Sequence, residues 1–345
     1  MSTMSDFDFS PSLGPVLNTG VIRQFVEDFC VVEHISFSPS GAGDHLYLYI
    51  EKRGCNTDWV ASQLASIAGL KLVDIGYAGK KDRHAVTQQW FSLHMPNQEE
   101  PDWESLPPEI RILSKTRHEK KLKSGAILSN KFRLVIRSLT GDLSEIERRL
   151  LLLQKQGIPN YFGAQRFGNN NGNVRKLIDM VKNRRRVKKS QRSMYISAGR
   201  SYLFNKILDY RVQQNNWNKA IAGDVMMLEG SHAIFSTETV DEQIERRIAE
   251  KDINPATLLW GRGERLSTGE ARSIEDGVLD ENPDIVDALE RVGSQLAHRS
   301  LRVNIPSLKW EFQTDSLTIS FDLPSGSYAT SVLSECIQVT DAHAL

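Results

Sequence analysis

The C-terminal end of this 345-residue chain constrains its fold more than any other stretch. Alternation of apolar and polar residues predicts a β-hairpin that turns near Asp315. About forty residues cannot bury a hydrophobic core by themselves. We therefore expect this end to complete a sheet begun by residues 20–140. The alternating apolar positions are Leu308, Trp310 and Phe312, then Leu317, Ile319 and Phe321.

The rest of the chain is long enough for a second domain. A length of 345 residues exceeds the usual single domain, and a hydrophobic fraction of 40% suffices for ordinary cores. The residue composition changes at 157–168, a loop rich in glycine and aromatic residues. We predict an α+β (mixed α/β) fold. Its first domain consists of 1–156 and 304–345, with an antiparallel or mixed sheet and flanking helices, and an α/β domain is inserted at 157–303.

Hydrophobic periodicity predicts the other elements. A capping box at Asp142 and Glu145 opens a helix that stops at Gly157. Asn56 or Thr57 caps a helix that ends at Gly69. Further helices are expected at 170–183, 190–215, 239–251 and 283–299, with strands at 27–33, 45–51, 72–75 and 130–137, short strands near 225–235, and a final helix after 331.

Charge is segregated along the chain although the formal net charge is zero. Residues 111–137 contain nine Lys or Arg and one acid, Glu119. Residues 182–192 contain seven basic residues and no acid, whereas acids collect between 238 and 290. A neutral protein with this distribution can present a positive face to an anionic partner.

Cysteine usage and the N-terminus indicate a compartment. Cys30, Cys55 and Cys336 are odd in number and far apart, which disfavours a disulfide framework or a zinc site and favours a reducing cytosol. The acidic, polar N-terminus lacks the pattern of a signal peptide. No apolar run approaches the roughly 18 residues of a membrane span. We expect a cytoplasmic protein without a membrane segment.

Asp82 is the candidate for chemistry. It follows Gly76 and Gly79 and is flanked by four potential cations, Lys80, Lys81, Arg83 and His84. Positive charge on both sides favours the ionised carboxylate, which suits a nucleophile or an anion held for structure. Position alone also fits an ordinary turn aspartate.

Several other chemistries lack their motifs. Asp74 stands where a phosphate-binding loop needs its first glycine, and no Ser or Thr follows Gly79-Lys80. The eight histidines show no metal-ligand spacing, and no Gly-x-Ser-x-Gly elbow occurs. We therefore expect no metal and no cofactor.

The stretch Gly-Tyr-Ala-Gly-Lys-Lys-Asp-Arg-His-Ala-Val-Thr-Gln-Gln-Trp at 76–90 resembles the catalytic signature of the tRNA pseudouridine synthase D family. The resemblance extends to Glu-Asp-Phe at 27–29, Asn-x-Phe at 130–132, the loop at 157–168 and Leu-Pro-Ser-Gly-Ser-Tyr-Ala-Thr-Ser at 323–331. Val26 stands where the family usually has proline, and Tyr328 where it usually has phenylalanine. The similarity covers nearly the whole chain.

The resemblance assigns roles to individual residues. Asp82 matches the catalytic aspartate, and Arg23 matches a basic residue, commonly lysine, that neighbours it. Asn130 matches a residue at the rim of the site, where an amide can read the edge of a base. The rings of Phe29, Phe132 and Tyr328 are expected to contact the uracil.

The expected reaction is isomerisation of uridine to pseudouridine, by family at position 13 of tRNA, with the base flipped out and attacked by Asp82. Two readings stay open beside it: a non-catalytic RNA-binding protein and an RNA glycosylase or hydrolase. We expect a monomer whose basic stretches contact the tRNA backbone. The residues expected to make those contacts are Lys120, Lys121, Lys123, Arg184, Arg185 and Arg186.

Overall fold

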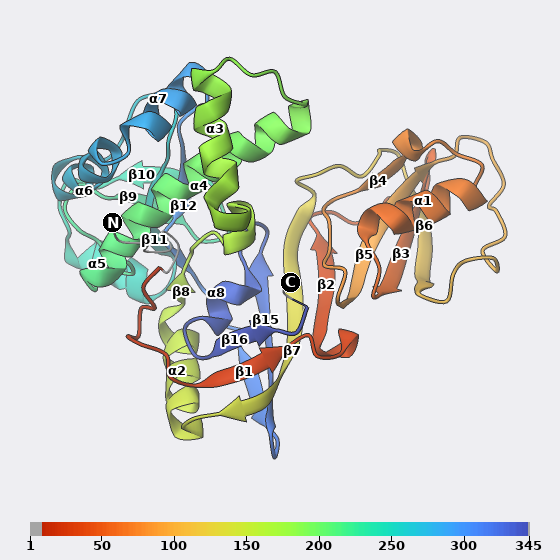
Figure 1. The fold of residues 1–345 in the computed structure, drawn as a ribbon, viewed down its shortest axis with the longest axis horizontal. Coiled ribbons are helices and arrows are strands. Elements are labelled where there is room, and N and C mark those ends of the chain that lie inside the picture. The colour runs from red at the N-terminus through yellow and green to blue at the C-terminus, as the bar shows by residue number, and fades with distance from the viewer. Residues whose placement is uncertain (1–8, 344–345) are drawn as a thin grey trace. The chain divides into compact units, whose positions relative to one another are not determined.

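The computed structural model describes residues 9–343, which divide into two compact units (Figure 1). Unit 1 comprises residues 9–16, 147–304 and 326–336, and unit 2 comprises 17–146, 305–325 and 337–343. One boundary falls inside helix α2 (Leu143–Gln156). The predicted α+β class is confirmed, while an inserted domain bounded at 157 and 303 stays a prediction.

Unit 2 is built on a ten-stranded mixed sheet whose main path runs β14-β15-β7-β2-β5-β3-β6. β2 and β5 pair in parallel, as do β1 and β16, and the other pairs are antiparallel. The strands are β1 (Thr19–Ile22), β2 (Phe29–Ile35), β3 (His45–Arg53), β4 (Ile75–Tyr77), β5 (Val86–His94), β6 (Ile110–His118), β7 (Ile127–Thr140), β14 (Lys309–Phe312), β15 (Ser316–Pro324) and β16 (Gln338–Asp341).

The C-terminal strands complete this sheet, as the alternating apolar pattern predicts. β14 and β15 form the hairpin, and β15 pairs with β7 along its whole length, from Ser316 opposite Arg137 to Pro324 opposite Ser129. Leu317, Ile319 and Phe321 are buried. Two segments nearly two hundred residues apart thus share one layer.

Helix α1 (Thr57–Ile67) covers the β3–β5 part of the sheet (Figure 1). Val60 and Leu64, four residues apart, are fully buried against Leu48, Ile50 and Phe91. This is the inward stripe that helical spacing predicts.

Unit 1 contains a four-stranded antiparallel sheet in the order β10-β9-β11-β12. Its core lies between helices and the sheet, where Leu177, Phe204, Leu258 and Leu289 are buried in one cluster. The elements are β8 (Ile158–Pro159), α3 (Gly172–Lys182), α4 (Lys189–Gln213), β9 (Val225–Leu228), β10 (Ile234–Ser236), α5 (Glu242–Ala249), β11 (Ile253–Leu259), α6 (Gly269–Asp280), α7 (Pro283–Arg291), β12 (Ala297–Ser300), β13 (Arg302–Val303) and α8 (Ala329–Leu333).

Two predictions from periodicity were wrong. Residues Leu72–Asp74 form a 3₁₀ turn with Leu72 58% and Val73 71% exposed, and the strand begins only at Ile75. The helix predicted at 283–299 ends at Arg291, because Gly293 adopts φ +73° and the chain then enters β12, which pairs with β11. Helix α6 has no counterpart among the predicted helices.

No helix among residues 9–343 has the length and apolar character needed to cross a bilayer.

Glu335 gives unit 1 a predictable pH dependence. Its buried carboxylate accepts hydrogen bonds from the backbone N and the hydroxyl of Ser12, at 2.9 and 2.7 Å. Burial, only partly offset by these bonds, raises the pKa of Glu335 from 4.5 to about 7. Because the folded state holds this proton more tightly than the unfolded state, the group stabilises the folded state fully below pH 4.5. That stabilisation is lost as pH rises through about 7.

We predict that Glu335→Gln, which keeps an acceptor for Ser12, removes the part of the fall in the free energy of unfolding between pH 5 and pH 8 that Glu335 causes. The Glu335 contribution to the wild-type value should fall over that range by at most roughly 3 kcal/mol. Urea unfolding at pH 5 and pH 8 measures the difference, with the exposed Glu250→Gln as control. An equal pH slope in Glu335→Gln and wild type contradicts the prediction.

Candidate active site

Asp82 lies in the segment between β4 and β5 in unit 2. Its side chain is 41% exposed, so the carboxylate reaches solvent while its backbone is fixed beneath it. Two glycines allow the segment to approach the sheet. A Cβ at Gly76 would lie 2.4 Å from the Leu122 carbonyl oxygen, and one at Gly79 would lie 2.8 Å from Ile127 Cδ1.

Three buried polar side chains hold the backbone of this segment. The Thr57 hydroxyl accepts from the Lys81 amide at 3.0 Å and donates to Gln89 Oε1 at 3.0 Å. Gln89 Nε2 donates to the Gly79 carbonyl at 3.1 Å. Lys52 Nζ donates to the carbonyls of Cys55 and Asp82, each at 2.7 Å. The backbone on both sides of the Asp82 Cα is therefore tied to α1, β3 and β5.

Lys52 is the unusual member of this group. The residue is fully buried, and the acceptors recorded for its ammonium are neutral carbonyls. Burial lowers the pKa of Lys52 to about 8, an effect partly offset by Cys55 and Asp82. A buried cation is costly without compensating hydrogen bonds, so these two carbonyls are held firmly in place. Sequence reasoning missed Lys52, since a lysine near the end of a strand normally reads as exposed.

Arg23 pairs with the Asp82 carboxylate, as the family resemblance implies. One guanidinium nitrogen lies 3.2 Å from Asp82 Oδ2, and the other lies 2.5 Å from Asp341 Oδ2 on β16. The Arg23 side chain is 8% exposed, and its guanidinium carbon lies 4.0 Å from the centroid of the Phe29 ring. Arg23 has φ +58°, an uncommon conformation for a residue other than glycine, immediately after β1. Asp341 was not anticipated from the sequence.

Three of the four potential cations adjacent to Asp82 in sequence, Lys80, Lys81 and His84, contact other groups, which corrects the expectation that they surround it. Lys80 pairs with Asp58 at 2.6 Å, and Lys81 pairs with the fully buried Glu33 at 2.5 Å. The ring of His84 stacks on His343 at 3.9 Å between centroids. Among the described residues, the cation that pairs with Asp82 is Arg23, which lies 59 residues earlier in the chain.

Phe29 and Phe132 meet edge to face on the neighbouring strands β2 and β7, with centroids 6.2 Å apart. Phe132 also stacks on Phe321 of β15 at 5.5 Å. Phe29 is 2% and Phe132 8% exposed. Asn130 lies two residues before Phe132 on β7, hence on the same face of the sheet, and its buried Oδ1 has no hydrogen-bond partner among the described residues.

Tyr328 belongs to unit 1, where it immediately precedes α8. Its hydroxyl accepts from Nη2 and Nε of Arg166, at 2.6 and 3.1 Å. Its ring packs edge to face with Phe162, and a Cβ at Gly163 would come within 3.0 Å of it. The glycine-aromatic loop 157–168 therefore supplies the partner for the hydroxyl that distinguishes Tyr328 from the family's usual phenylalanine.

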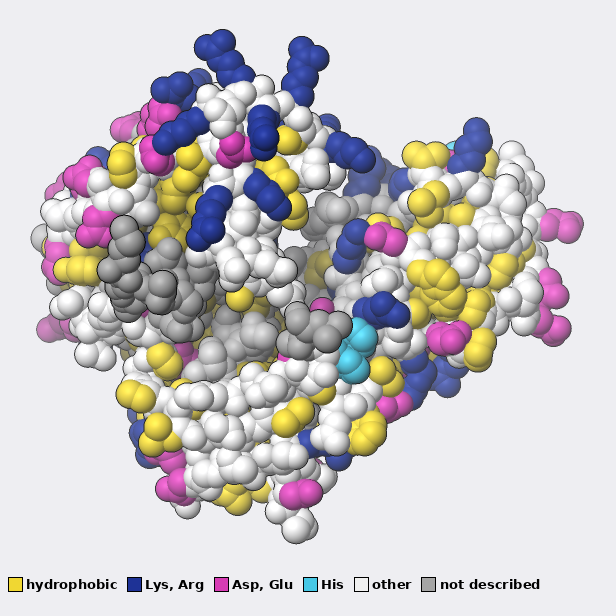
Figure 2. Space-filling model, viewed as in Figure 1, with side chains coloured by type: hydrophobic (Ala, Val, Ile, Leu, Met, Phe, Trp, Pro, Cys, Tyr) yellow, Lys and Arg dark blue, Asp and Glu magenta, His cyan; other side chains and the backbone are white. Residues whose placement is uncertain are grey.

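The predicted RNA contacts fall into one group in each unit. In unit 2, Lys120 and Lys123 are exposed without a side-chain partner among the described residues, whereas Lys121 Nζ turns back to the Val73 carbonyl. In unit 1, Arg184, Arg185 and Arg186 follow α3, and Figure 2 shows Lys and Arg side chains gathered over α3 and the segment after it.

No group of three or more His, Cys, Asp or Glu side chains within residues 9–343 is arranged to hold a metal ion.

Comparison with known proteins matches residues 18–181 and 172–336 to the family model described as tRNA pseudouridine synthase D (TruD). The chain is 43% identical to tRNA pseudouridine synthase D of Methylococcus capsulatus, over 96% of this chain and 94% of the relative. It is also 43% identical to that of Hydrogenovibrio crunogenus, over 98% and 97%. A crystal structure from Methanosarcina mazei that carries the same family name superposes with a TM-score of 0.71 at 19% identity, covering 97% of this chain and 95% of that one, which shows a common fold.

Lys52 generates a prediction about the segment itself. We expect Lys52→Met to speed amide hydrogen exchange of residues 78–85 by about tenfold or more, because two buried carbonyls lose their donor. Lys80→Met is the matched control: it breaks an exposed ion pair, and such pairs contribute only about 0–1 kcal/mol. Exchange mass spectrometry measures both variants. Equal protection of this segment in Lys52→Met and wild type refutes the role assigned to Lys52.

Proposed function

The chain belongs to the tRNA pseudouridine synthase D family and isomerises uridine to pseudouridine, and we propose that its target is uridine 13 of tRNA, attacked by Asp82. The observation that carries the assignment of Asp82 is its geometry: a half-exposed carboxylate with a rigid backbone, paired with a buried arginine. An ionised oxygen that is accessible and fixed in place meets the requirements of a nucleophile.

The reaction is an isomerisation, so its atoms balance without an oxidant or reductant. The bond between N1 and the ribose C1′ breaks, C5 of the turned base bonds to C1′, C5 loses its proton and N1 gains one. A covalent intermediate on Asp82 divides this exchange into two easier steps. No group beyond the carboxylate and a route for the proton is required by this balance.

Arg23 is proposed as the positioning residue. By donating to Asp82 with one nitrogen and to Asp341 with the other, its planar guanidinium fixes the direction in which the Asp82 carboxylate points. Stacking on the Phe29 ring holds the plane of the guanidinium. Phe29 then contributes to the site mainly through Arg23, since its own ring is 2% exposed.

The remaining candidates are proposed to hold the uracil. Extruding a base costs a few kcal/mol, and stacking on an aromatic ring returns about 1–3 kcal/mol. Phe132 is the proposed stacking ring, and the unpartnered Oδ1 of Asn130 is available to accept from the N3–H of uracil. Tyr328, with its hydroxyl fixed by Arg166, is proposed as a second aromatic contact.

We further propose that the protein acts in the cytoplasm as a monomer. Cys30, Cys55 and Cys336 are all free thiols, which fits a reducing compartment. The substrate is a large polyanion, and exposed cations on both units offer it contacts without requiring a second copy of the chain.

The reaction itself is tested by incubating the purified protein with transcribed tRNA that carries tritium at C5 of uridine. Tritium is released as pseudouridine forms, and the RNA chain stays intact. A glycosylase instead yields free uracil, and a binding protein releases neither tritium nor uracil. Replacement of uridine 13 by cytidine should abolish the release, and persistence of the release contradicts the proposed position.

Asp82→Asn is predicted to abolish pseudouridine formation while tRNA binding stays within about twofold of wild type, because the two side chains differ little in size. Rates under single-turnover conditions and filter binding give the two readouts. Residual turnover above about a tenth of the wild-type rate would exclude covalent catalysis by this residue.

Lys120 and Lys123 generate a prediction about the substrate. Replacing both by Gln should weaken tRNA binding and reduce the slope of log affinity against log salt by roughly one to two, because each contact with a phosphate releases counterions. Lys121→Gln is the matched control and should change the slope less, since Lys121 Nζ is engaged with Val73. An unchanged slope in the double variant places these lysines away from the RNA.

A further inference from the structure

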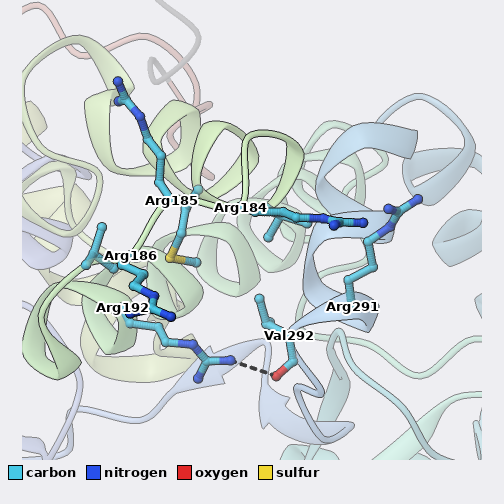
Figure 3. A pocket seen from close by; sticks show the side chains of 9 residues that line it. Arg184, Arg185, Arg186, Arg192, Arg291 and Val292 are labelled. Atoms are coloured by element: carbon cyan, nitrogen blue, oxygen red, sulfur yellow. Dashed lines mark hydrogen bonds between the residues drawn. The ribbon is translucent and has the colours of Figure 1, made fainter.

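A pocket of about 570 Å³ lies in unit 1 where α3 ends, α4 begins and α7 ends (Figure 3). Five arginines line it: Arg184, Arg185, Arg186, Arg192 and Arg291. The remaining lining residues are apolar, and no acidic residue is among them. We call it the arginine pocket.

The positive charge of the arginine pocket is only partly compensated. Arg185 pairs with Asp179 at 2.8 Å, and Arg291 pairs with Asp287 at 2.7 Å. Arg192 donates to the neutral Val292 carbonyl at 3.1 Å. The side chains of Arg184 and Arg186 have no partner in the part of the chain that the structure describes. At least two guanidinium groups are thus available to an anion, and their forked donors match phosphate oxygens.

The apolar part of the wall narrows the class of ligand. Met180, Val181, Val187 and Val292 line the pocket beside the arginines. An inorganic anion gains nothing from apolar carbon, whereas a nucleobase can lie against it and stack on a guanidinium plane. In Figure 3 Arg186 and Arg192 extend toward Val292, whereas Arg184 and Arg291 extend toward each other on another side of the pocket, and Arg185 points away. The pocket volume also exceeds what a phosphate fills and lies in the usual range of small-molecule sites.

The backbone at Arg184 supplies a substitution suited to a test. Arg184, two residues after the end of α3, has φ +49°, and the amide of Arg185 donates to the Met180 carbonyl at 3.0 Å. Glycine is the relaxed residue in this conformation at a helix end. Arg184→Gly therefore removes a charge from the pocket and relieves the backbone at the same time, so the variant is expected to fold.

We propose that the arginine pocket receives one unpaired nucleotide of the bound tRNA. Its phosphate is held by Arg186 beside Arg192, Arg184 adds positive charge to the same pocket, and its base lies against Met180, Val187 and Val292. The pocket thereby recognises a nucleotide that is exposed from its helix rather than a paired stretch of backbone. This inference rests on the proposed function for the source of the nucleotide, but the affinity of the pocket can be measured without the reaction.

The first experiment uses calorimetry to measure the affinity of the full-length protein for adenosine 5′-monophosphate, for inorganic phosphate and for adenosine, each in a separate titration. Adenine cannot be isomerised, so this ligand does not report on the reaction at Asp82. We expect the monophosphate to bind about tenfold or more tightly than either phosphate or adenosine, because only it offers both contacts. Equal affinities for the monophosphate and phosphate overturn the proposal.

The second experiment compares Arg184→Gly/Arg186→Gln with Arg246→Gln, an exposed arginine on α5 that removes charge elsewhere in unit 1. The double variant should lose about tenfold or more in affinity for the monophosphate, and the control should keep the wild-type value. For tRNA, the double variant should raise KM and leave kcat unchanged. Unaltered monophosphate binding in the folded double variant, checked by its thermal melting, sinks the proposal.

The two hypotheses fail separately. If wild-type protein forms pseudouridine in tRNA but its affinity for the monophosphate does not depend on Arg184 and Arg186, only the nucleotide pocket is refuted. If the monophosphate binds as expected but no pseudouridine forms, only the proposed reaction is refuted.

Discussion

The candidate site depends on buried polar groups that have to be satisfied. Thr57, Gln89 and Lys52 lie beneath the segment 79–82 and are almost completely buried. A buried donor or acceptor left unpaired costs roughly 1–3 kcal/mol, and more if it is charged. Their hydrogen bonds to backbone groups of the segment are therefore strongly favoured. The result is a fixed backbone under a side chain that remains accessible, which is the arrangement that preorganised catalysis requires.

The charged side chains near Asp82 have two different roles: some fix the local structure, and one contacts the Asp82 carboxylate. Lys80 and Lys81 precede the aspartate in sequence but form ion pairs elsewhere, Lys80 with Asp58 and Lys81 with the buried Glu33. The cation that contacts the carboxylate is Arg23, which the parallel pairing of β1 with β16 places beside Asp341. A single guanidinium thus orders two carboxylates that are far apart in the sequence.

Basic residues at the arginine pocket of unit 1 differ from those near Asp82 in how far they are paired with acids. Near Asp82, Lys80, Lys81 and Arg23 each pair with an acid, whereas the exposed Arg184 and Arg186 have no partner among the described residues and line a pocket beside apolar side chains. An unpaired cation at the surface stays hydrated and therefore costs little folding free energy. Binding of a phosphate to it is favoured because counterions are released from the nucleic acid. A protein of zero net charge can in this way bind a polyanion through local patches.

Sequence alone determined the elements whose signal is local. The period of α1, α3 and α4, the alternation of β7 and β15 and the motif around Asp82 are all carried by neighbouring residues, and they were predicted. The helix forecast at 283–299 and the strand at 72–75 failed because pairing of β12 with β11 and exposure of Leu72 are set by distant parts of the fold. Only tertiary structure decided that Asp341 is a second partner of Arg23, that Lys52 points inward to the Asp82 carbonyl, and that Arg166 holds Tyr328. The physical reason is that a contact between residues far apart in the chain depends on how sheets and helices pack, and no short-range pattern encodes that geometry.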